Sequence, residues 1–236
     1  MNPAVRTIEL TKTYGEDETE VRALRDVSLE IPKGELAVLL GPSGSGKTTL
    51  LNQIGALEDP TSGTVEADGV VLADLDDKGR TAYRLNSIGF VFKFYNLVPT
   101  LTAKENVALI AELASSDGLR RTADVLERVG LADRMDHFPG QLSGGEQQRV
   151  SIARGLVKDP PLMLCDEPTG SLDVESGISI LDLLRDVTRE GERSVLIVTH
   201  NSVTAKMADR VIRLRDGQVI DQETNPSPAD PEQLDW

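Results

Sequence analysis

A glycine-rich segment, GPSGSGKTT (41–49), has the residue types and spacing that bind phosphate. It matches the pattern G-x-x-x-x-G-K-[ST] and lies between the apolar run LAVLL (36–40) and a helical pattern. Glycines let successive backbone N–H groups surround phosphate oxygens, and a helix N-terminus adds its positive dipole end. The alternative is a glycine-rich turn that matches the pattern by chance. The apolar strand before the segment makes this alternative less convincing. The predicted nucleotide-binding residues are Gly41, Pro42, Ser43, Gly44, Ser45, Gly46, Lys47, Thr48 and Thr49.

Two of these side chains have predicted contacts with the nucleotide and its cation. Lys47 is expected at the β- and γ-phosphates, and the Thr48 hydroxyl on Mg²⁺. The sequence therefore indicates ATP with Mg²⁺ as the bound species.

Two carboxylates end another apolar run, in PPLMLCDEPTG (160–170). Ligands of open α/β sheets bind beyond the carboxyl ends of the strands, so Asp166 and Glu167 should face the same crevice as the glycine-rich segment. We expect Asp166 to hold Mg²⁺ through water, and Glu167 to take a proton from an attacking water as general base. A solvated acidic turn is the alternative, and it is less convincing beside a phosphate motif.

A third segment, QLSGGEQQRVSIARGL (141–156), suggests a second anion site. Ser143, Gly144 and Gly145 form a small-residue helix start, where N–H groups and the helix dipole favour an anion. In isolation, an ordinary capped helix would be the better explanation of the segment. Together with the first motif, it resembles the signature of ATP-binding-cassette (ABC) ATPases. Two phosphate sites in one chain suggest head-to-tail pairing, in which LSGG of one copy covers nucleotide held by the other.

The resemblance to ABC ATPases extends over roughly residues 5–220 and implies roles for further residues. Tyr14 in KTYG resembles the aromatic residue that stacks on adenine, although a tyrosine that merely ends a strand is the alternative. Asp173 in GSLD resembles the acid of the loop that carries signals between paired subunits. His200 in LIVTHN resembles the histidine that contacts the γ-phosphate and positions water, although it could be structural.

One position departs from the ABC pattern. Where the family has a glutamine that bridges Mg²⁺ and the attacking water, this chain has Lys93. An ammonium group has three donors and no acceptor, so it cannot ligate Mg²⁺. At about 5 Å from the metal, and at an effective dielectric near 20, the gross repulsion would be roughly 6–7 kcal/mol. The negative charge of the triphosphate is of comparable size and acts in the opposite direction, so the net effect can have either sign.

Three interpretations of Lys93 remain open. It binds a γ-phosphate oxygen and slows turnover, it turns towards water or an acidic partner, or it is an engineered or drifted substitution in a weakened ATPase. The favoured hypothesis keeps ATP binding and weakens the coupling of hydrolysis to transport. Lys93 is therefore counted among the nucleotide-binding residues.

The segments YGEDETEVRALRDVSLEI (14–31) and FVFKFYNLVPTLTAKENV (90–107) resemble the branch that includes macrolide-efflux and lipoprotein-release ATPases. Such cassettes are short and work with a separately folded membrane permease, which implies that a permease docks near Phe94–Val98. Aromatic and aliphatic side chains exposed after a strand would form such a docking patch. Packing of these side chains under the helical segment that follows is the alternative.

Short apolar runs that alternate with helical patterns predict an α/β fold, in which these motifs are placed by a mixed, largely parallel sheet. We expect a P-loop NTPase core with an N-terminal antiparallel β part and a helical subdomain inserted at about 94–158. The ATPase domain is expected to span 1–220, and the acidic, proline-containing tail 221–236 to be disordered. Helices are predicted over Lys47–Leu57, Val174–Arg189 and Asn201–Met207. The predicted strands are TIEL (7–10), VSLEI (27–31), LAVLL (36–40), GTVEA (63–67), IGFVF (88–92), LMLCD (162–166), SVLIVT (194–199) and RVIRLR (210–215).

Composition limits the partners. A net charge of −14 disfavours nucleic acid and anionic lipid, although such acidity can also be a general habit of a salt-tolerant organism. The single cysteine excludes an intrachain disulfide, the N-terminus lacks an export signal, and no apolar run reaches the roughly 18–20 residues that cross a bilayer. We expect a cytoplasmic protein held on the inner face of the cell membrane through its permease.

The leading hypothesis is the ATP-hydrolysing subunit of an ABC transporter that pairs with a second copy of itself. A soluble ABC ATPase of DNA repair, translation or metal-cluster assembly is the main alternative. Repair members carry long inserts where this chain has fifty positions between Lys93 and Ser143, and translation members usually carry two cassettes. A regulatory ATP-binding module with low turnover is supported only by Lys93, and the presence of Glu167 and His200 argues against it.

Overall fold

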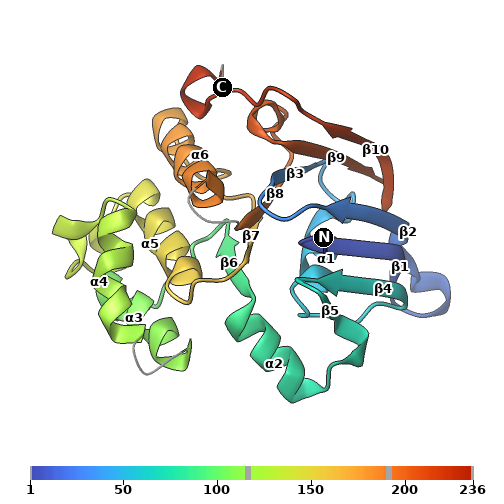
Figure 1. Cartoon of the computed structure of the whole chain (residues 1–236), viewed down its shortest axis with the longest axis horizontal. Helices are drawn as coiled ribbons and strands as arrows, with labels where there is room; N and C mark the ends of the chain where they lie inside the picture. The colour runs from blue at the N-terminus through green and yellow to red at the C-terminus, as the bar shows by residue number, and fades with distance from the viewer. Residues whose placement is uncertain (1, 115–117, 190–192, 235–236) are drawn as a thin grey trace.

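The computed structural model describes residues 2–114, 118–189 and 193–234. Its centre is a six-stranded sheet in the order β10-β9-β3-β8-β7-β6 (Figure 1). Four apolar runs and the arginine-containing run 210–215 form five strands that pair in parallel, in a sheet whose two faces are both covered. These are β3 (Leu36–Leu40), β6 (Ile88–Phe92), β7 (Leu162–Asp166), β8 (Ser194–Thr199) and β9 (Arg210–Arg215), and the edge strand β10 (Gln218–Thr224) runs antiparallel to β9.

A second sheet is antiparallel, in the order β2-β1-β4-β5. Buried and exposed positions mix along its strands, as expected where one face packs on the core and the other meets solvent. Its strands are β1 (Val5–Tyr14), β2 (Val21–Ile31), β4 (Ser62–Ala67) and β5 (Val70–Val71). Their N-terminal position confirms the antiparallel β part that the sequence predicted.

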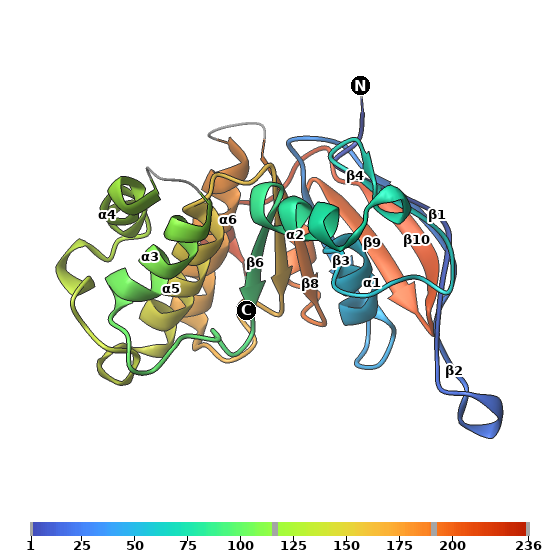
Figure 2. The ribbon, with the colours of Figure 1, turned by 90° about the horizontal axis from the view of Figure 1, so that it is seen from below.

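Three helices between β6 and β7 form the inserted helical part. Figures 1 and 2 both place α3, α4 and α5 at one end of the molecule and the antiparallel sheet at the other, with the parallel sheet between them. The helices are α1 (Lys47–Ile54), α2 (Asp77–Asn86), α3 (Ala103–Ala114), α4 (Gly118–Arg128), α5 (Gly144–Leu156) and α6 (Val174–Arg189).

Two apolar clusters hold these layers together. One joins the inserted helices and α6 to the parallel sheet, and it includes Val107, Ile152 and Leu184. The other lies between the parallel sheet, α1 and the antiparallel sheet, and it includes Leu39 and Leu50. The expected fold class, an α/β core with an antiparallel part and a helical insert, is confirmed.

Some elements differ from the sequence prediction because their apolar signal is weak. Helix α2 was missed since Tyr83 is its only buried residue, although the Asp76 side chain caps it by accepting from the Gly79 N–H at 2.7 Å. The helix expected over Asn201–Met207 is only a 3₁₀ turn, Thr204–Met207, whose buried Thr204 and Met207 have the three-residue spacing of that turn.

The tail corrects the expectation of disorder for residues 221–236. Residues 221–224 continue β10, and Pro231–Gln233 form a 3₁₀ turn that packs against α6. Leu234 is buried in the first apolar cluster, and the Ala229 N–H donates to the Lys206 carbonyl at 2.9 Å. Residues 235 and 236 lie outside the described residues. Within the described ranges, no helix is both long and apolar enough to span a bilayer.

Candidate functional site

The carboxyl ends of four parallel strands bring the predicted site residues to one edge of the sheet. The glycine-rich loop follows β3, His200 follows β8, Asp166 ends β7 and Lys93 follows β6. These strands are neighbours in the order β3-β8-β7-β6, and the Cα pairing places Phe92 beside Asp166 and Asp166 beside Val198. Strand order therefore brings the predicted residues to one edge of the sheet.

The glycine-rich loop requires glycine at its two ends. Gly46 has φ +100°, and a Cβ placed on it would lie 2.4 Å from the Ala23 carbonyl oxygen. A Cβ on Gly41 would lie 2.2 Å from the Leu214 carbonyl oxygen. The loop is held from outside by the Gly217 N–H, which donates to the Ser45 carbonyl at 3.1 Å. The backbone of residues 23 and 214 thus packs closely against the two ends of the loop, whose own N–H groups can surround phosphate oxygens.

Lys47 folds back over this loop. Its Nζ donates to the Gly41 and Pro42 carbonyls, each at 2.8 Å, which leaves one of the three ammonium donors for a ligand. Burial lowers the pKa of Lys47, and the charges of Glu167 and Asp166 oppose that shift. The side chain can therefore offer a positioned positive charge in a partly desolvated place.

Thr48 and Asp166 form an oxygen cluster opposite Lys47. Thr48 Oγ1 lies 3.2 Å from Asp166 Oδ2 and 3.4 Å from Oδ1. Burial raises the pKa of Asp166, the Thr48 hydrogen bond opposes this, Glu167 raises the pKa further, and Lys47 and Lys93 lower it. A hydroxyl and a carboxylate that lacks full hydration are hard oxygen ligands, so the residues present fit Mg²⁺.

Glu167 and His200 form a second pair. Glu167 Oε1 lies 2.7 Å from His200 Nδ1, and Thr199 Oγ1 donates to Glu167 Oε2 at 3.4 Å. Glu167 also adopts φ +47°, a conformation that is uncommon outside glycine and that concentrates at functional sites. The Glu167 side chain is 17% exposed and that of His200 is 56% exposed, so the carboxylate is shielded while the imidazole is open to solvent. The pair can bind and orient a water and accept its proton.

Lys93 follows β6 and lies beside the GSLD segment. A Cβ placed on Gly170 would be 3.1 Å from Lys93 Cε and 3.4 Å from Nζ. The ammonium also lies 5.8 Å from the centre of the Phe94 ring. Among residues 2–114, 118–189 and 193–234, no carboxylate oxygen lies within 4.0 Å of Lys93 Nζ. Lys93 is therefore a cation without an ion-pair partner in the described chain, at the same edge as Asp166.

The signature residues lie on a capped helix. Ser143 caps α5: its Oγ accepts from the Glu146 N–H at 3.2 Å, and Glu146 Oε2 accepts from the Ser143 N–H at 2.7 Å. Gly144 and Gly145 have close neighbours, since a Cβ on Gly144 would lie 3.0 Å from the Tyr95 hydroxyl. Asp173 accepts from Ser176 N–H at 2.9 Å and from Ser176 Oγ at 2.8 Å near the start of α6, and these bonds lower its pKa.

A hollow of about 510 Å³ lies beside the glycine-rich loop. Neither the signature residues nor Tyr14 line it. The Tyr14 hydroxyl instead donates to Glu58, and Lys12 Nζ lies 5.1 Å above the Tyr14 ring. Sequence reasoning missed the contribution of β2 and of the β9–β10 turn, because these segments reach the loop only through tertiary packing. The hollow is lined by Val21, Arg22, Ala23, Arg25, Gly44, Gly46, Lys47, Thr48, Thr49, Asp216 and Gly217.

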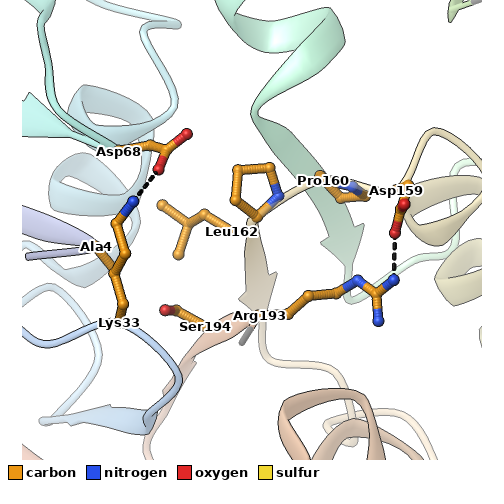
Figure 3. A pocket seen from close by; sticks show the side chains of 9 residues that line it. Ala4, Lys33, Asp68, Asp159, Pro160, Leu162, Arg193 and Ser194 are labelled. Carbon is orange, nitrogen blue, oxygen red and sulfur yellow. Dashed lines mark hydrogen bonds and ion pairs between the residues drawn. The ribbon is translucent and has the colours of Figure 1, made fainter. Parts of the chain in front are cut away.

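A second hollow, of about 290 Å³, lies at the opposite, amino end of β7 and β8 (Figure 3). Its charges are paired: Lys33 Nζ lies 2.6 Å from Asp68 Oδ1, and Arg193 pairs with Asp159. Figure 3 shows the two pairs on opposite sides, with Leu162 between them and Pro160 beside Asp159. No residue of the glycine-rich loop lines it, and charges that satisfy one another leave little for a ligand. The carboxyl edge is therefore the better candidate for chemistry.

The segment Phe94–Val98 is partly exposed and partly packed. Phe94 is 74% exposed, whereas Leu97 contacts the first apolar cluster. Asn106 fixes the backbone of Val98, accepting from its N–H at 2.8 Å and donating to its carbonyl at 3.1 Å. Next to this segment is a hollow of about 180 Å³, lined by Phe90, Phe92, Tyr95, Ile110, Ser151, Arg154, Gly155 and Lys158.

Known proteins share both the sequence and the fold. The chain matches the ABC transporter family over residues 24–170, more than half of its length. The lipoprotein-releasing system ATP-binding protein LolD of Bordetella pertussis is 46% identical over 220 residues, which cover 92% of this chain and 95% of LolD. The macrolide export ATP-binding/permease protein MacB of Hyphomonas neptunium is 43% identical over 230 residues, which cover 96% of this chain and 36% of MacB.

A solved structure agrees with these relatives. The dimeric structure of a post-hydrolysis state of the ATP-binding cassette MJ0796, bound to ADP and Pi, superposes with a TM-score of 0.85. It is 42% identical in sequence, and the match covers 93% of this chain and 98% of that one. The resemblance stated from the motifs, including the macrolide-efflux and lipoprotein-release branch, is confirmed. The chain belongs to the ABC transporter family and is an ATP-binding cassette with ATPase function.

Proposed function

We propose that this chain is the ATP-hydrolysing subunit of a membrane transporter and that two copies pair head to tail around two ATP molecules. The observation that carries the proposal is the division of phosphate-binding groups within one chain. The glycine-rich loop, Thr48 and Asp166 share one edge, whereas Ser143, Gly144 and Gly145 are absent from the hollow beside that loop. The signature is therefore available to a nucleotide held by a second copy. The dimeric state of the MJ0796 cassette supports the pairing of two copies.

At each phosphate loop, Lys47 donates to the β- and γ-phosphates while Thr48 and Asp166 hold Mg²⁺. When bound by these residues, Mg²⁺ would supply positive charge that compensates the phosphates. Glu167 accepts the proton of the attacking water, and His200 fixes the carboxylate through the 2.7 Å contact and orients the water at the γ-phosphate. Gly41, Pro42, Ser43, Gly44, Ser45, Gly46 and Thr49 complete the phosphate site through backbone and hydroxyl groups.

Tyr14 stacks on adenine in this proposal. Its hydroxyl bond to Glu58 and the Lys12 cation above its ring fix the orientation of the aromatic plane, which lowers the entropy cost of stacking. Across the pair, Ser143, Gly144 and Gly145 donate to the γ-phosphate from the start of α5. Asp173, held by Ser176, places the GSLD segment at the contact between copies.

A separate membrane permease docks near Phe94–Val98 and holds the cassette at the cytoplasmic face of the membrane. Phe94, at 74% exposure, and the neighbouring hollow offer an aromatic contact. The names of LolD and MacB, which refer to lipoprotein release and macrolide export, support a transporter partner. The net charge of −14 argues against nucleic acid.

Lys93 slows hydrolysis in this proposal. It lies at the edge occupied by Asp166, and its ammonium offers no acceptor to Mg²⁺ or to the hydrogens of the attacking water. ATP binding is retained because the triphosphate attracts the same cation. The expected consequence is tight nucleotide binding with low turnover.

Glu167→Gln tests the proposal. We expect turnover to fall about 10²- to 10⁴-fold, because general-base catalysis contributes that much, while ATP binding persists. ATP with Mg²⁺ should then convert the variant from monomer to dimer in size-exclusion chromatography. Glu112→Gln, an exposed change on α3, is the matched control and should hydrolyse ATP normally. A Glu167→Gln variant that binds ATP and stays monomeric would refute the head-to-tail pairing.

The transporter role needs its own test. The chain should co-purify from membranes with an integral membrane protein, and Phe94→Asp should release it without changing ATP affinity. A stable soluble complex with nucleic acid or ribosomes, and no membrane protein, would overturn the transporter role.

A further inference from the structure

Lys93 differs from Lys47, Asp166 and Glu167, because its ammonium has no ion-pair or hydrogen-bond partner within the described ranges and contacts only the Phe94 ring, at 5.8 Å from the ring centre. Lys47 donates to two backbone carbonyls, Asp166 contacts Thr48, and Glu167 contacts His200. No carboxylate oxygen of the described ranges lies within 4.0 Å of Lys93 Nζ. A partly buried cation that is left unpaired is costly, so an anion at this edge would be bound favourably.

The fold makes room for this side chain. Lys93 Cε and Nζ lie 3.1 Å and 3.4 Å from the point where a Cβ of residue 170 would stand, so the absence of a side chain at Gly170 leaves that place to the lysine. The backbone of Gly170 is held by its N–H, which donates to the Glu167 carbonyl at 3.0 Å. The ammonium is therefore positioned next to the segment that leaves Asp166 and Glu167.

The charges at this edge require compensation. Asp166 and Glu167 are adjacent in sequence, and ATP adds a triphosphate beside them. Mg²⁺ is the usual counter-charge for phosphates in such sites. Lys93 supplies one positive charge that is fixed to the chain, directly after Phe92, which pairs with Asp166 in the sheet. An attached cation needs no association from solution, so it acts even when divalent cations are scarce.

We propose that Lys93 is a built-in counter-ion that replaces part of the charge compensation of Mg²⁺, so that ATP binding and ATP-driven pairing of this cassette depend only weakly on a divalent cation. This inference rests on the proposed function of the same site. It separates two uses of the metal: charge compensation during binding, which Lys93 shares, and organisation of the attacking water, which it cannot perform.

The test measures ATP affinity by isothermal titration calorimetry with excess Mg²⁺ and with EDTA. The quantity compared is the ratio of the two dissociation constants. For the unchanged chain we expect the dissociation constant to rise less than about tenfold in EDTA. For Lys93→Gln we expect this ratio of dissociation constants to be about ten times larger than in the unchanged chain. Lys93→Met should behave like Lys93→Gln, whereas Lys93→Arg should keep the small ratio because it keeps the charge. Lys104→Gln, which removes an exposed lysine of α3, is the matched control for net charge.

A second variant displaces the lysine without removing its charge. Gly170→Ala places a methyl group 3.1 Å from Lys93 Cε, which is close enough to push the flexible end of the lysine aside, and the ratio should move towards that of Lys93→Gln. Dimer formation by Glu167→Gln in ATP with EDTA gives a readout independent of turnover: it should persist with Lys93 and be lost when Lys93→Gln is added.

The outcomes are distinguishable. If Lys93→Gln and the unchanged chain lose the same factor of affinity in EDTA, the inference is wrong while the ATPase assignment stands. If neither binds ATP even with Mg²⁺, the proposed function of the site fails. A larger loss for Lys93→Gln than for Lys104→Gln, with Lys93→Arg unaffected, supports the built-in counter-ion.

Discussion

The two edges of the parallel sheet carry similar charges and use them differently. At the amino edge, Lys33 pairs with Asp68 at 2.6 Å and Arg193 pairs with Asp159 (Figure 3). At the carboxyl edge, Lys47 donates only to backbone carbonyls, and Lys93 has no carboxylate within 4.0 Å among the described residues. Opposite charges that form ion pairs are satisfied within the fold, whereas cations without a carboxylate partner at this edge are available to an anion.

The source of this difference is geometric. Parallel strands direct their carboxyl ends, and the following loops and helix N-termini, to one edge, which gathers N–H donors and dipoles there. The amino edge receives the strand starts, such as Leu162 and Ser194, and its turns are joined by ion pairs and by the Ser194 Oγ, which accepts from the Gly34 N–H at 3.0 Å. The hollows at the two edges therefore differ in character as well as in size, at about 290 Å³ for the amino edge and about 510 Å³ beside the glycine-rich loop.

The largest expected difference between the two edges is the effect of removing a lysine on ATP affinity. Lys47→Met should weaken ATP binding about 10- to 100-fold, because charge-assisted hydrogen bonds to phosphate contribute about 1.5–3 kcal/mol. Lys33→Met removes the same charge at the other edge and should leave affinity within about twofold. Calorimetric titration of both variants with MgATP is the measurement. Equal losses in the two variants would show that both edges act through general electrostatics.

A smaller effect concerns the pH dependence of stability, and it has opposite signs at the two edges. Burial raises the pKa of Asp166, so the folded protein binds a proton that the unfolded chain has released between the two pKa values. Stability is then lost as the pH rises through the folded pKa. Asp166→Asn should raise the unfolding free energy at pH 7 by about 0.5–1 kcal/mol, after allowance for solvent screening, and have little effect at acid pH.

Asp159 should show the reverse. The hydrogen bond from Arg193 lowers its pKa, so its contribution is present above the usual value of 3.8 and is lost as the pH falls through the folded pKa. Asp159→Asn should lower stability at pH 7 by about 0.2–1 kcal/mol and have no effect in strong acid. Urea unfolding at both pH values measures the two variants together. The same sign for both would contradict the assignment of paired and unpaired edges.

The smallest expected effect is the coupling energy of the Lys33–Asp68 ion pair at the amino edge. A double-mutant cycle with Lys33→Met and Asp68→Asn should give a coupling energy of about 0.2–1 kcal/mol, as for other exposed ion pairs. Added salt should reduce it, because both side chains are partly open to solvent. A coupling energy above about 2 kcal/mol would show that the ion pair at the amino edge contributes strongly to stability.

Much of the site was readable from the sequence because its chemistry is local. The GPSGSGKTT loop needs consecutive backbone donors, so its glycines and its lysine are contiguous (41–49). Asp166 and Glu167 end an apolar strand, and Ser143 with Glu146 forms a capping box, a pattern of fixed spacing. Apolar runs likewise predicted the parallel strands.

The missed features depend on contacts between distant segments or on weak apolar patterns. Helix α2 has one buried residue, and β10 is an edge strand whose residues are mostly exposed. The tail is ordered by Leu234, a single apolar anchor in an acidic stretch. The lining of the nucleotide-side hollow by Ala23 and Arg25 follows from the packing of β2 on the loop, and no local signal marks it.

The sequence by itself determined the phosphate chemistry, the fold class and the family, because each depends on residues whose spacing is set by a single loop, strand or helix. Only the tertiary structure decided which charges are paired. Lys33 and Lys93 are alike in the sequence, yet strand order places one against Asp68 and the other against Gly170, where no carboxylate of the described chain reaches it. The reason is that ion pairing depends on distances of a few ångströms between segments far apart in the chain.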